Sequence, residues 1–580
     1  MFELRPDIPD EEVVARARSA KCAGFGWFQG FAPHVGRRSP EDAEFEAARL
    51  GDLSERERWT LENAAHAAAD DHGSPYDWRA VRFPRRSARV EILRRPFLIE
   101  VAMLFALTGA AAVAFGRSLR ADPVYDEGVY LASVDALAHG QKLGSEIFTS
   151  QPPGFYVLLE AERFVSGGSL VAMRIAMLAL AIVGCLCAYY VGRCLAGRVG
   201  GFSAMALLAA ALSVEDEAVR VRADFPSVTL SLVAIALALF AVRRAGAIAP
   251  VAATLAGGAL AAAVSVKLLA ATAVVPVLAI VLRHGRRLIP EVAAGAAAVA
   301  AAFAVAYAGV LGSLWSDVVR FHLKAESAPI EGAPRDLAGN VAKIVSTLTD
   351  SHGVHSPFPW LLAIGAVGTM AAWRRRVLLG AVPLWLWAAA SATFLAWHRP
   401  LWAHDIVMLT AALAVASGVG LATLLAEDRV APRALAAVCV LVIAASIAHH
   451  MERTPAGENS GIEWAATVLR ERTPEGSEVA SDLPIIPFLA NRRQPGPLID
   501  TSTTRFESGW LTKKRIIREI DRDRLSAVVI GHNLASDREV VRAVEARFPF
   551  SVQLTHVGLP GEKPVTLRLY FSQPQVTRAT

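Results

Sequence analysis

The sequence predicts a mostly α-helical, polytopic membrane protein with about eleven transmembrane helices and a small external α/β domain at its C-terminus. Three observations support this fold class. Hydrophobic residues make up 54% of the 580 residues and charged residues only 19%, whereas soluble proteins carry about a quarter charged residues. Nearly all long apolar runs lie between residues 96 and 450, with polar sequence on either side. Arginines gather at the ends of these runs, as membrane topology requires.

The distribution of charge argues against a nucleic-acid partner, and the positions of the cysteines argue against a structural disulfide. The net charge is +5, but the arginines lie where a membrane topology places them, so no nucleic-acid partner is expected. Five cysteines are present, and none of them forms a pair in the external segments. We therefore expect no structural disulfide.

The polar segment 1–95 is interpreted as a cytoplasmic N-terminal extension. Helical stretches are expected around Asp10–Ala20 and Pro40–Ala69, and the segment contains no motif that we can assign. It has no signal-peptide pattern, because the first apolar run of any length begins at Phe97.

The apolar runs of segment 96–450 predict eleven spans, several of them shorter than the roughly 20 residues that cross a bilayer core. The predicted spans are Phe97–Gly116, Ser169–Gly192, Val199–Val214, Phe225–Val242, Pro250–Ser265, Leu268–Leu282, Ile289–Leu311, Pro357–Trp373, Val377–Trp397, Ile406–Ala426 and Ala434–Ala448.

Alternate loops between these spans are basic, which sets the orientation. With the N-terminus inside the cell, the cytoplasmic side receives the arginine clusters near residues 85–95, 193–198, 243–244, 283–287, 374–376 and 429–433. The positive-inside rule then places the protein in a plasma membrane with its C-terminal domain outside the cytoplasm.

The C-terminal segment 451–580 alternates helix and strand signals, which is typical of a small α/β domain. Helices are predicted at Ile462–Arg472, Thr512–Asp523 and Asp537–Phe548, and strands at Glu478–Ser481, Pro497–Asp500, Ser526–Ile530, Ser551–Val557 and Val565–Phe571. The segment lacks a glycine-rich phosphate loop, so a nucleotide site is not expected there.

The first external loop, residues 117–168, carries two adjacent carboxylates, Asp126 and Glu127. Tyr130, Val134 and Leu137 follow at helical spacing, which predicts an amphipathic helix on the bilayer surface. A carboxylate held there can take a proton from an acceptor hydroxyl. The alternative is that Asp126 only caps the helix.

Later in the same loop, Gln151 is followed by two prolines and Gly154, which predict a rigid turn. A second short helix is expected at Phe155–Phe164, with Tyr156 in its first turn. The turn is also compatible with a purely structural role.

Charged residues near the outer boundary of the membrane form another candidate site. Arg222 and Asp224 lie between the third and fourth spans, and Lys267 interrupts an apolar stretch. A lysine in such a place is costly unless paired or solvated, and it could bind an anionic lipid headgroup. The alternative is that Lys267 snorkels or pairs with Asp224 to hold the helices together.

The short loop after the ninth span combines His398, Arg399 and His404 between Trp397 and Asp405. The basic side chains could contact phosphate, while the tryptophan suits an interfacial aromatic belt. Two histidines and one aspartate at this spacing are weak evidence for a metal. No cofactor is expected.

Together these residues resemble the GT-C glycosyltransferases, in particular the group related to protein O-mannosyltransferases and aminoarabinose transferases. The resemblance covers about residues 97–450. It depends on the order of Asp126-Glu127-x-x-Tyr130, Gln151-Pro-Pro-Gly154, Arg222-Ala-Asp224, Lys267 and Arg399-Pro-Leu-Trp-Ala-His404.

The resemblance implies a function that composition cannot show. Such enzymes move a sugar from a polyprenyl-phosphate carrier to an acceptor on the outer face of the membrane by a single inverting displacement. By position, Asp126 is then the base and Glu127 assists or orients it. Lys267, Arg222, Asp224, His398, Arg399 and His404 hold the donor phosphate, and Tyr130, Gln151 and Tyr156 belong to the substrate loop. The acceptor is a protein, a lipid or a glycan.

Two other hypotheses remain open from the sequence. A transporter or lipid flippase is the first, although no internal repeat is evident and the polar residues cluster at one face. The second is a non-catalytic relative that keeps the fold.

Overall fold

The computed structural model describes residues 86–351, 354–355, 363, 365–369, 381–425, 460–522, 524–531, 533–557 and 565–573. The chain divides into two compact units, Met1–Pro96 and Phe97–Thr580. The helices expected near Asp10–Ala20 and Pro40–Ala69, the span at 434–448 and most of the span at 357–373 lie outside the described residues. The number of spans and the position of the N-terminal extension therefore stay predictions.

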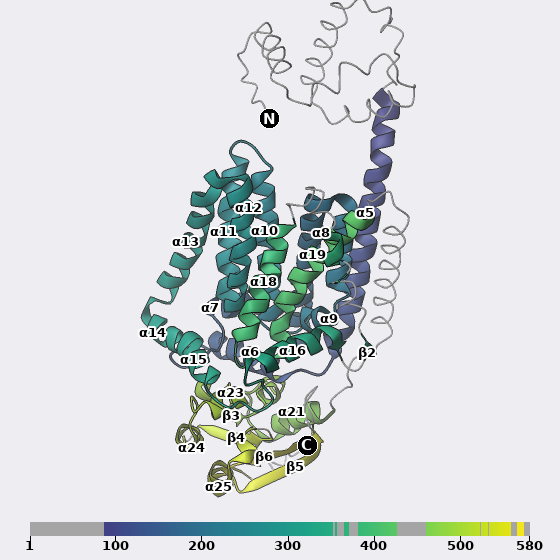
Figure 1. Cartoon of the computed structure of the whole chain (residues 1–580). Coiled ribbons are helices and arrows are strands. Elements are labelled where there is room, and N and C mark those ends of the chain that lie inside the picture. Colours follow the sequence, from purple (N-terminus) through teal and green to yellow (C-terminus); the bar gives the residue numbers. More distant parts are fainter. Residues whose placement is uncertain are drawn as a thin grey trace, which may run out of the picture. The chain divides into compact units, whose positions relative to one another are not determined.

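Long apolar helices confirm the mostly α-helical membrane fold (Figure 1). Six helices of the described chain are long and apolar enough to cross a membrane, and two further apolar helices are shorter. The long ones are α5 (Arg86–Gly116), α8 (Leu170–Ala209), α10 (Asp224–Val242), α11 (Ile248–Val266), α13 (Ile289–Ala306) and α19 (Val407–Leu425). The shorter ones are α12 (Val274–His284), which follows the 3-10 turn η4 (Leu268–Ala273), and α18 (Val382–Trp397).

Helix α8 accounts for two predicted spans, because its backbone is not helical at Ala196 and Gly197. A Cβ atom added to Gly192 would lie 2.3 Å from the carbonyl oxygen of Gly200. The two halves of α8 therefore fold back on each other at this break, and only glycine allows their backbones to come so close. The second half ends at Ala209, and the short helix α9 (Leu212–Ala218) follows it.

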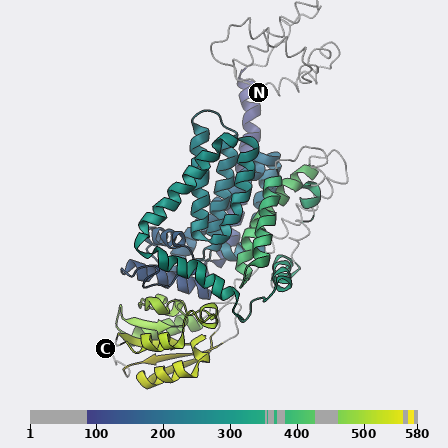
Figure 2. The same cartoon turned by 60° about the vertical axis from the view of Figure 1, so that its left-hand side comes forward.

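Short helices lie at the end of the helical bundle that faces the β-sheet (Figures 1 and 2). The two surface helices predicted in the first loop, after Glu127 and at Phe155–Phe164, are present. The short helices at this end are α6 (Tyr125–Ala138), α7 (Pro153–Ser166), α14 (Leu311–Trp315), the π-helix η7 (Ser316–Arg320), α15 (Phe321–Glu326) and α16 (Leu337–Thr349), after which come the two-residue strands β1 (Asp350–Ser351) and β2 (Val354–His355).

The C-terminal segment contains a four-stranded sheet of order β3-β4-β6-β5 with helices around it. The strands are β3 (Glu478–Ser481), β4 (Leu525–Ile530), β5 (Phe550–Val557) and β6 (Val565–Phe571), and the helices are α21 (Ser460–Arg472), α22 (Ile485–Leu489), α23 (Thr503–Glu507), α24 (Lys513–Ile520) and α25 (Arg538–Arg547). Strands β3 and β4 are parallel, whereas β6 is antiparallel to β4 and β5.

One predicted strand, Pro497–Asp500, is wrong. The chain there forms the 3-10 turn η9 (Gly496–Leu498) and then an irregular segment. Pro495 precedes the turn and Pro497 lies within it, and a proline has no N–H to donate to a β-ladder. Asp500 is therefore not part of the β-sheet.

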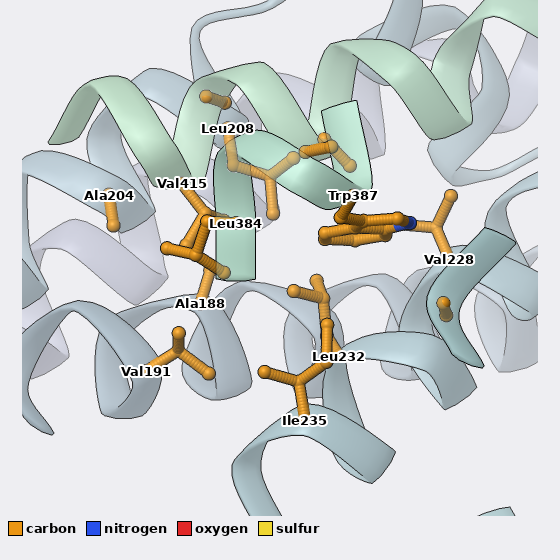
Figure 3. Packing of buried hydrophobic residues seen from close by; sticks show 14 of the residues in the cluster. Ala188, Val191, Ala204, Leu208, Val228, Leu232, Ile235, Leu384, Trp387 and Val415 are labelled. Carbon is orange, nitrogen blue, oxygen red and sulfur yellow. The ribbon is translucent and has the colours of Figure 1, made fainter. Parts of the chain in front are cut away.

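Two large hydrophobic clusters of the described chain join elements that are far apart in sequence. The first joins the membrane helices, and Trp387 from α18 is fully buried in it, together with Val228 of α10 and Val415 of α19 (Figure 3). The second joins α6 and α7 to the C-terminal sheet through residues such as Leu131 and Val529. The C-terminal domain is therefore packed directly on the loop that carries Asp126 and Glu127.

Candidate active site

A cavity of about 900 Å³ lies between the ends of the membrane helices and the C-terminal domain. It receives side chains from α6, α15, the segment before α10, the α11–η4 junction and the loop 397–405. The C-terminal domain closes it with the segment around Asp500–Thr504. Most of the predicted site residues meet here, although they are far apart in sequence.

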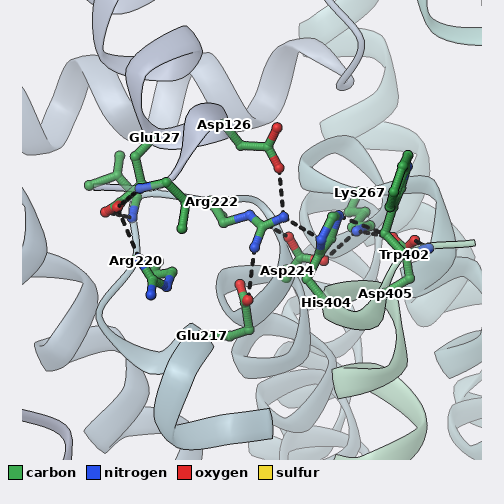
Figure 4. Close-up of polar contacts among 12 residues, drawn as sticks. Asp126, Glu127, Glu217, Arg220, Arg222, Asp224, Lys267, Trp402, His404 and Asp405 are labelled. Atoms are coloured by element: carbon green, nitrogen blue, oxygen red, sulfur yellow. Dashed lines mark hydrogen bonds and ion pairs between the residues drawn. The ribbon is translucent and has the colours of Figure 1, made fainter. Parts of the chain in front are cut away.

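Asp126 lies in the first turn of α6 and faces the cavity, with 34% of its side chain exposed. Its Oδ2 accepts a hydrogen bond from Arg222 Nη2 at 2.6 Å (Figure 4). Burial favours the neutral acid, but the charges of Arg222, His404 and Lys267 outweigh it and lower the pKa of Asp126. Asp126 is therefore a carboxylate at neutral pH.

Glu127, rather than Asp126, reaches back to the start of the helix. Its Oε2 accepts from the N–H of Val124, the N-cap residue, at 3.2 Å. No capping hydrogen bond from Asp126 is found in the described chain. The helix-capping role that the sequence left open for Asp126 therefore belongs to Glu127.

The Glu127 carboxylate is completely buried and is held by charged partners. Arg174 donates to it from Nε at 2.8 Å and from Nη2 at 2.6 Å, and the Val221 N–H donates at 3.1 Å. Burial opposes ionisation, but Arg174 and Arg220 lower the pKa of Glu127 to about 2. Glu127 does not line the cavity within the described chain, and its contacts instead hold the start of α6.

Arg222 connects the carboxylates of the site (Figure 4). It donates to Asp126, to Glu217 at 2.8 Å and to the Nδ1 atom of His404. Asp224 Oδ2 lies 3.9 Å from its Nε. The side chain is 9% exposed, and its fork geometry fixes several acceptors at once.

Lys267 lies in extended backbone between α11 and η4, which brings its side chain into the cavity. The ammonium donates to Asp224 and, at 2.7 Å, to Asp405. Burial favours the neutral amine, but these two carboxylates raise the pKa of Lys267 above its ordinary range. The pairing with Asp224 that the sequence left open is present, and Lys267 also lines the cavity as a cation.

The loop 397–405 places His398, Arg399 and His404 in the cavity wall. Asn340 of α16 holds the end of α18 and the start of this loop by donating to the carbonyl oxygens of Leu395, Ala396 and His398 at 3.3, 3.0 and 2.8 Å. Burial lowers the pKa of His398, which is therefore neutral at pH 7. The Arg399 Nε is buried and has no hydrogen-bond partner in the described chain.

The three substrate-loop residues divide between cavity and core. Tyr130 and Gln151 line the cavity. Tyr156 is only 1% exposed and packs near Tyr130, with ring centroids 6.4 Å apart. A Cβ atom on Gly154 would lie 2.2 Å from Ser265 Oγ, so this glycine lets α7 approach the chain just before Lys267.

Several pairings and residues of the site were not predicted from the sequence. Asp405 pairs with Lys267, and Arg174 pairs with Glu127. The C-terminal domain adds five polar side chains to the cavity, namely Asp500, Ser502, Thr503, Thr504 and Asn533. Asp405 follows His404 directly, and this adjacency was a usable signal. The C-terminal residues belong to no motif.

Asp224, His404 and Asp405 could hold a metal ion, because their ligand atoms lie within 4.8 Å of one another. The Lys267 ammonium contacts both of these carboxylates. It therefore stands where a cation between Asp224 and Asp405 would bind, and a metal would have to displace it.

Comparison with solved structures identifies the fold. ArnT from Cupriavidus metallidurans bound to undecaprenyl phosphate is 15% identical, with a TM-score of 0.57 over 81% of this chain and 97% of that chain. The apo form of the same protein is 14% identical, with a TM-score of 0.56 over 83% and 100%. No protein-family model and no curated protein matches the sequence. The chain is therefore a polytopic membrane protein with the fold of ArnT, and the GT-C fold expected from the resemblance is confirmed.

Proposed function

We propose that this protein is an inverting glycosyltransferase that moves a sugar from a polyprenyl-phosphate carrier to an acceptor hydroxyl at the outer face of the plasma membrane. One observation carries the proposal. A carboxylate, Asp126, shares a cavity at the ends of the membrane helices with the cations Lys267 and Arg399. The fold is that of ArnT, which has been solved with undecaprenyl phosphate bound.

The reaction follows from these groups. The acceptor oxygen attacks the anomeric carbon while the bond between that carbon and the phosphate oxygen breaks. The bonding electrons leave with the phosphate, and the acceptor proton passes to Asp126. A single displacement of this kind inverts the anomeric configuration. Asp126 can accept this proton because it is ionised and its side chain lines the cavity.

The phosphate that leaves gains negative charge and needs preorganised donors. Lys267 uses two of its three N–H donors for Asp224 and Asp405, which leaves one for a phosphate oxygen. The Nε of Arg399 has no partner among the residues that the structure describes, and this guanidinium suits a fork-like contact with phosphate. Arg222 holds Asp126 in place, and neutral His398 can donate one hydrogen bond. Glu127 and Arg174 fix the start of α6 behind the base.

The test is sugar transfer in membranes that contain the full-length protein, with a panel of radiolabelled polyprenyl-phosphate sugars. The membranes supply protein, lipid and glycan acceptors. We expect label to move from at least one donor, and the product to have the opposite anomeric configuration from the donor. Membranes without the protein are the control. If no donor is used although folded protein is present, the proposal is wrong, and lipid or solute transport becomes the next activity to measure.

A further inference from the structure

The C-terminal domain presents a polar surface to the cavity, opposite the membrane helices. We call this surface the hydroxyl wall and define it by Asp500, Ser502, Thr503, Thr504 and Asn533. Three members carry hydroxyl groups, one an amide and one a carboxylate. Side chains of this kind donate and accept hydrogen bonds at fixed positions, which is what the hydroxyl groups of a sugar ring require.

The wall is tied to the helix that carries Asp126. The hydroxyl of Tyr125, the residue before Asp126, accepts a hydrogen bond from the Thr501 N–H at 2.9 Å. Asn533 Nδ2 donates to the Thr501 carbonyl oxygen at 2.7 Å, and its Oδ1 accepts from the Thr503 hydroxyl at 2.9 Å. The wall therefore has a fixed position relative to the base.

A buried arginine supports the wall from behind. Arg505 is 1% exposed and donates to the carbonyl oxygens of Pro497, at 2.9 Å, and of Asp500. Its guanidinium carbon lies 4.0 Å from the centre of the Phe148 ring, in the first loop. A binding surface held by packing and hydrogen bonds of this kind is preorganised for a ligand.

Among the members of the wall, Asp500 and Thr504 use the smallest part of their side-chain hydrogen-bonding capacity within the described chain. Asp500 is 5% exposed, and the Ser502 N–H donates to its Oδ1 at 2.9 Å. Burial, with a further contribution from the charge of Asp126, raises the pKa of Asp500. The two carboxyl groups thus interact electrostatically from opposite elements of the cavity. The Thr504 hydroxyl makes no hydrogen bond within the described chain.

We infer that the hydroxyl wall binds the sugar ring of the lipid-linked donor. In this arrangement Asp500 and Thr504 form hydrogen bonds with the hydroxyl groups of the ring. This inference rests on the proposed function. A donor whose phosphate lies on Lys267 and Arg399 has its ring in the same cavity, whereas an acceptor needs only one hydroxyl near Asp126. The C-terminal domain then determines which sugar is transferred.

The experiment measures binding of lipids to the purified full-length protein in nanodiscs. The probes are undecaprenyl phosphate and undecaprenyl phosphate linked to glucose, mannose, galactose or arabinose. We expect wild type to bind at least one sugar-bearing lipid about tenfold or more tightly than undecaprenyl phosphate, since several hydrogen bonds are added. Asp500→Asn and Thr504→Val should each reduce this preference by roughly 2- to 12-fold, which is the range for one hydrogen bond.

Affinity for undecaprenyl phosphate itself should not change in these variants. Thr467→Val is the matched control, because Thr467 is an exposed hydroxyl residue of the same domain on α21, outside the cavity. The inference is overturned if no sugar-bearing lipid is preferred, if the variants keep the preference, or if they weaken both lipids equally. If wild type does not bind undecaprenyl phosphate at all, the proposed function fails as well.

Discussion

At the scale of single residues, Asp126 and Glu127 are adjacent carboxylates with different environments. Successive residues of a helix point about 100° apart, so the two side chains leave α6 in different directions. Asp126 reaches the cavity, whereas Glu127 is buried against Arg174. The sequence predicted both residues as a catalytic pair, and the contacts of Glu127 favour the orienting role.

The first prediction concerns Glu127→Gln. Removing this charge leaves Arg174 buried without its carboxylate, which should lower the free energy of unfolding by about 3–5 kcal/mol. The pKa of Glu127 falls from 4.5 to about 2 on folding, so its stabilisation is fully present above pH 4.5 and is lost as the pH falls toward 2. Thermal unfolding in detergent measures both effects. Asp126→Asn is the control, and an equal loss of stability in that variant would contradict our assignment.

The second prediction concerns Asp317, whose burial beside Thr149 raises its pKa from 3.8 to about 6. A group with a raised pKa binds more protons when folded, so its contribution to stability falls as the pH rises from about 4 to 6. Asp317→Asn should remove this dependence and unfold at a higher temperature than wild type at pH 7. Melting temperatures from pH 4.5 to 8 test this, with exposed Glu331→Gln as control. Parallel curves for Asp317→Asn and wild type would refute it.

At the scale of elements, α6 depends on its contact with α22 of the C-terminal domain. A Cβ atom on Gly128 would lie 2.6 Å from the backbone nitrogen of Ile485. Such an atom cannot be accommodated unless one helix moves.

The third prediction is therefore that Gly128→Ala destabilises the protein by about 1–3 kcal/mol, as overpacking does, and reduces sugar transfer because α6 carries Asp126. Limited proteolysis of the C-terminal domain and thermal unfolding measure the structural effect. Gly312→Ala is the control, since a Cβ atom there meets nothing within 4 Å. If both variants behave as wild type, the contact between α6 and α22 is not tight in solution.

The elements differ in how far the sequence predicts them. Long apolar runs and arginine clusters were sufficient for helices such as α10 and α11, because the membrane imposes helix on any apolar span. The turn at Pro497 was misassigned as a strand, since a short apolar run has no periodicity that distinguishes the two.

Site residues that belong to a local sequence pattern were predicted. Site residues that reach the cavity only through long-range packing were missed. Asp126, Arg222 and Lys267 were recognised because each is a charge at a membrane boundary. Asp500 and Thr504 were not, because the hydrogen bond that positions them joins Tyr125 to Thr501. No local pattern contains information about a contact between residues so far apart.

At the scale of the whole molecule, the chemistry that we propose depends on lysine and arginine rather than on a metal. Lys267 contacts both Asp224 and Asp405, where a metal would bind. The fourth prediction is that EDTA changes the rate of sugar transfer by less than about twofold, because Lys267 already occupies the position between these carboxylates. Each tenfold change in rate would require about 1.4 kcal/mol of transition-state stabilisation.

The same assay with added Mg²⁺ or Mn²⁺ should give no increase. Loss of activity in EDTA, with recovery after Mn²⁺ is added, would instead make Asp224, His404 and Asp405 a metal centre.

The central claim is that Asp126 is the base of a sugar-transfer reaction, and one measurement tests it most directly. Sugar transfer from a labelled polyprenyl-phosphate donor is compared between wild-type protein and Asp126→Asn, at equal amounts of folded protein in the same membranes. We predict that the variant loses about 10²- to 10⁴-fold in rate, as removal of a general base does, while its melting temperature stays close to that of wild type. Equal transfer by the two proteins would contradict the claim.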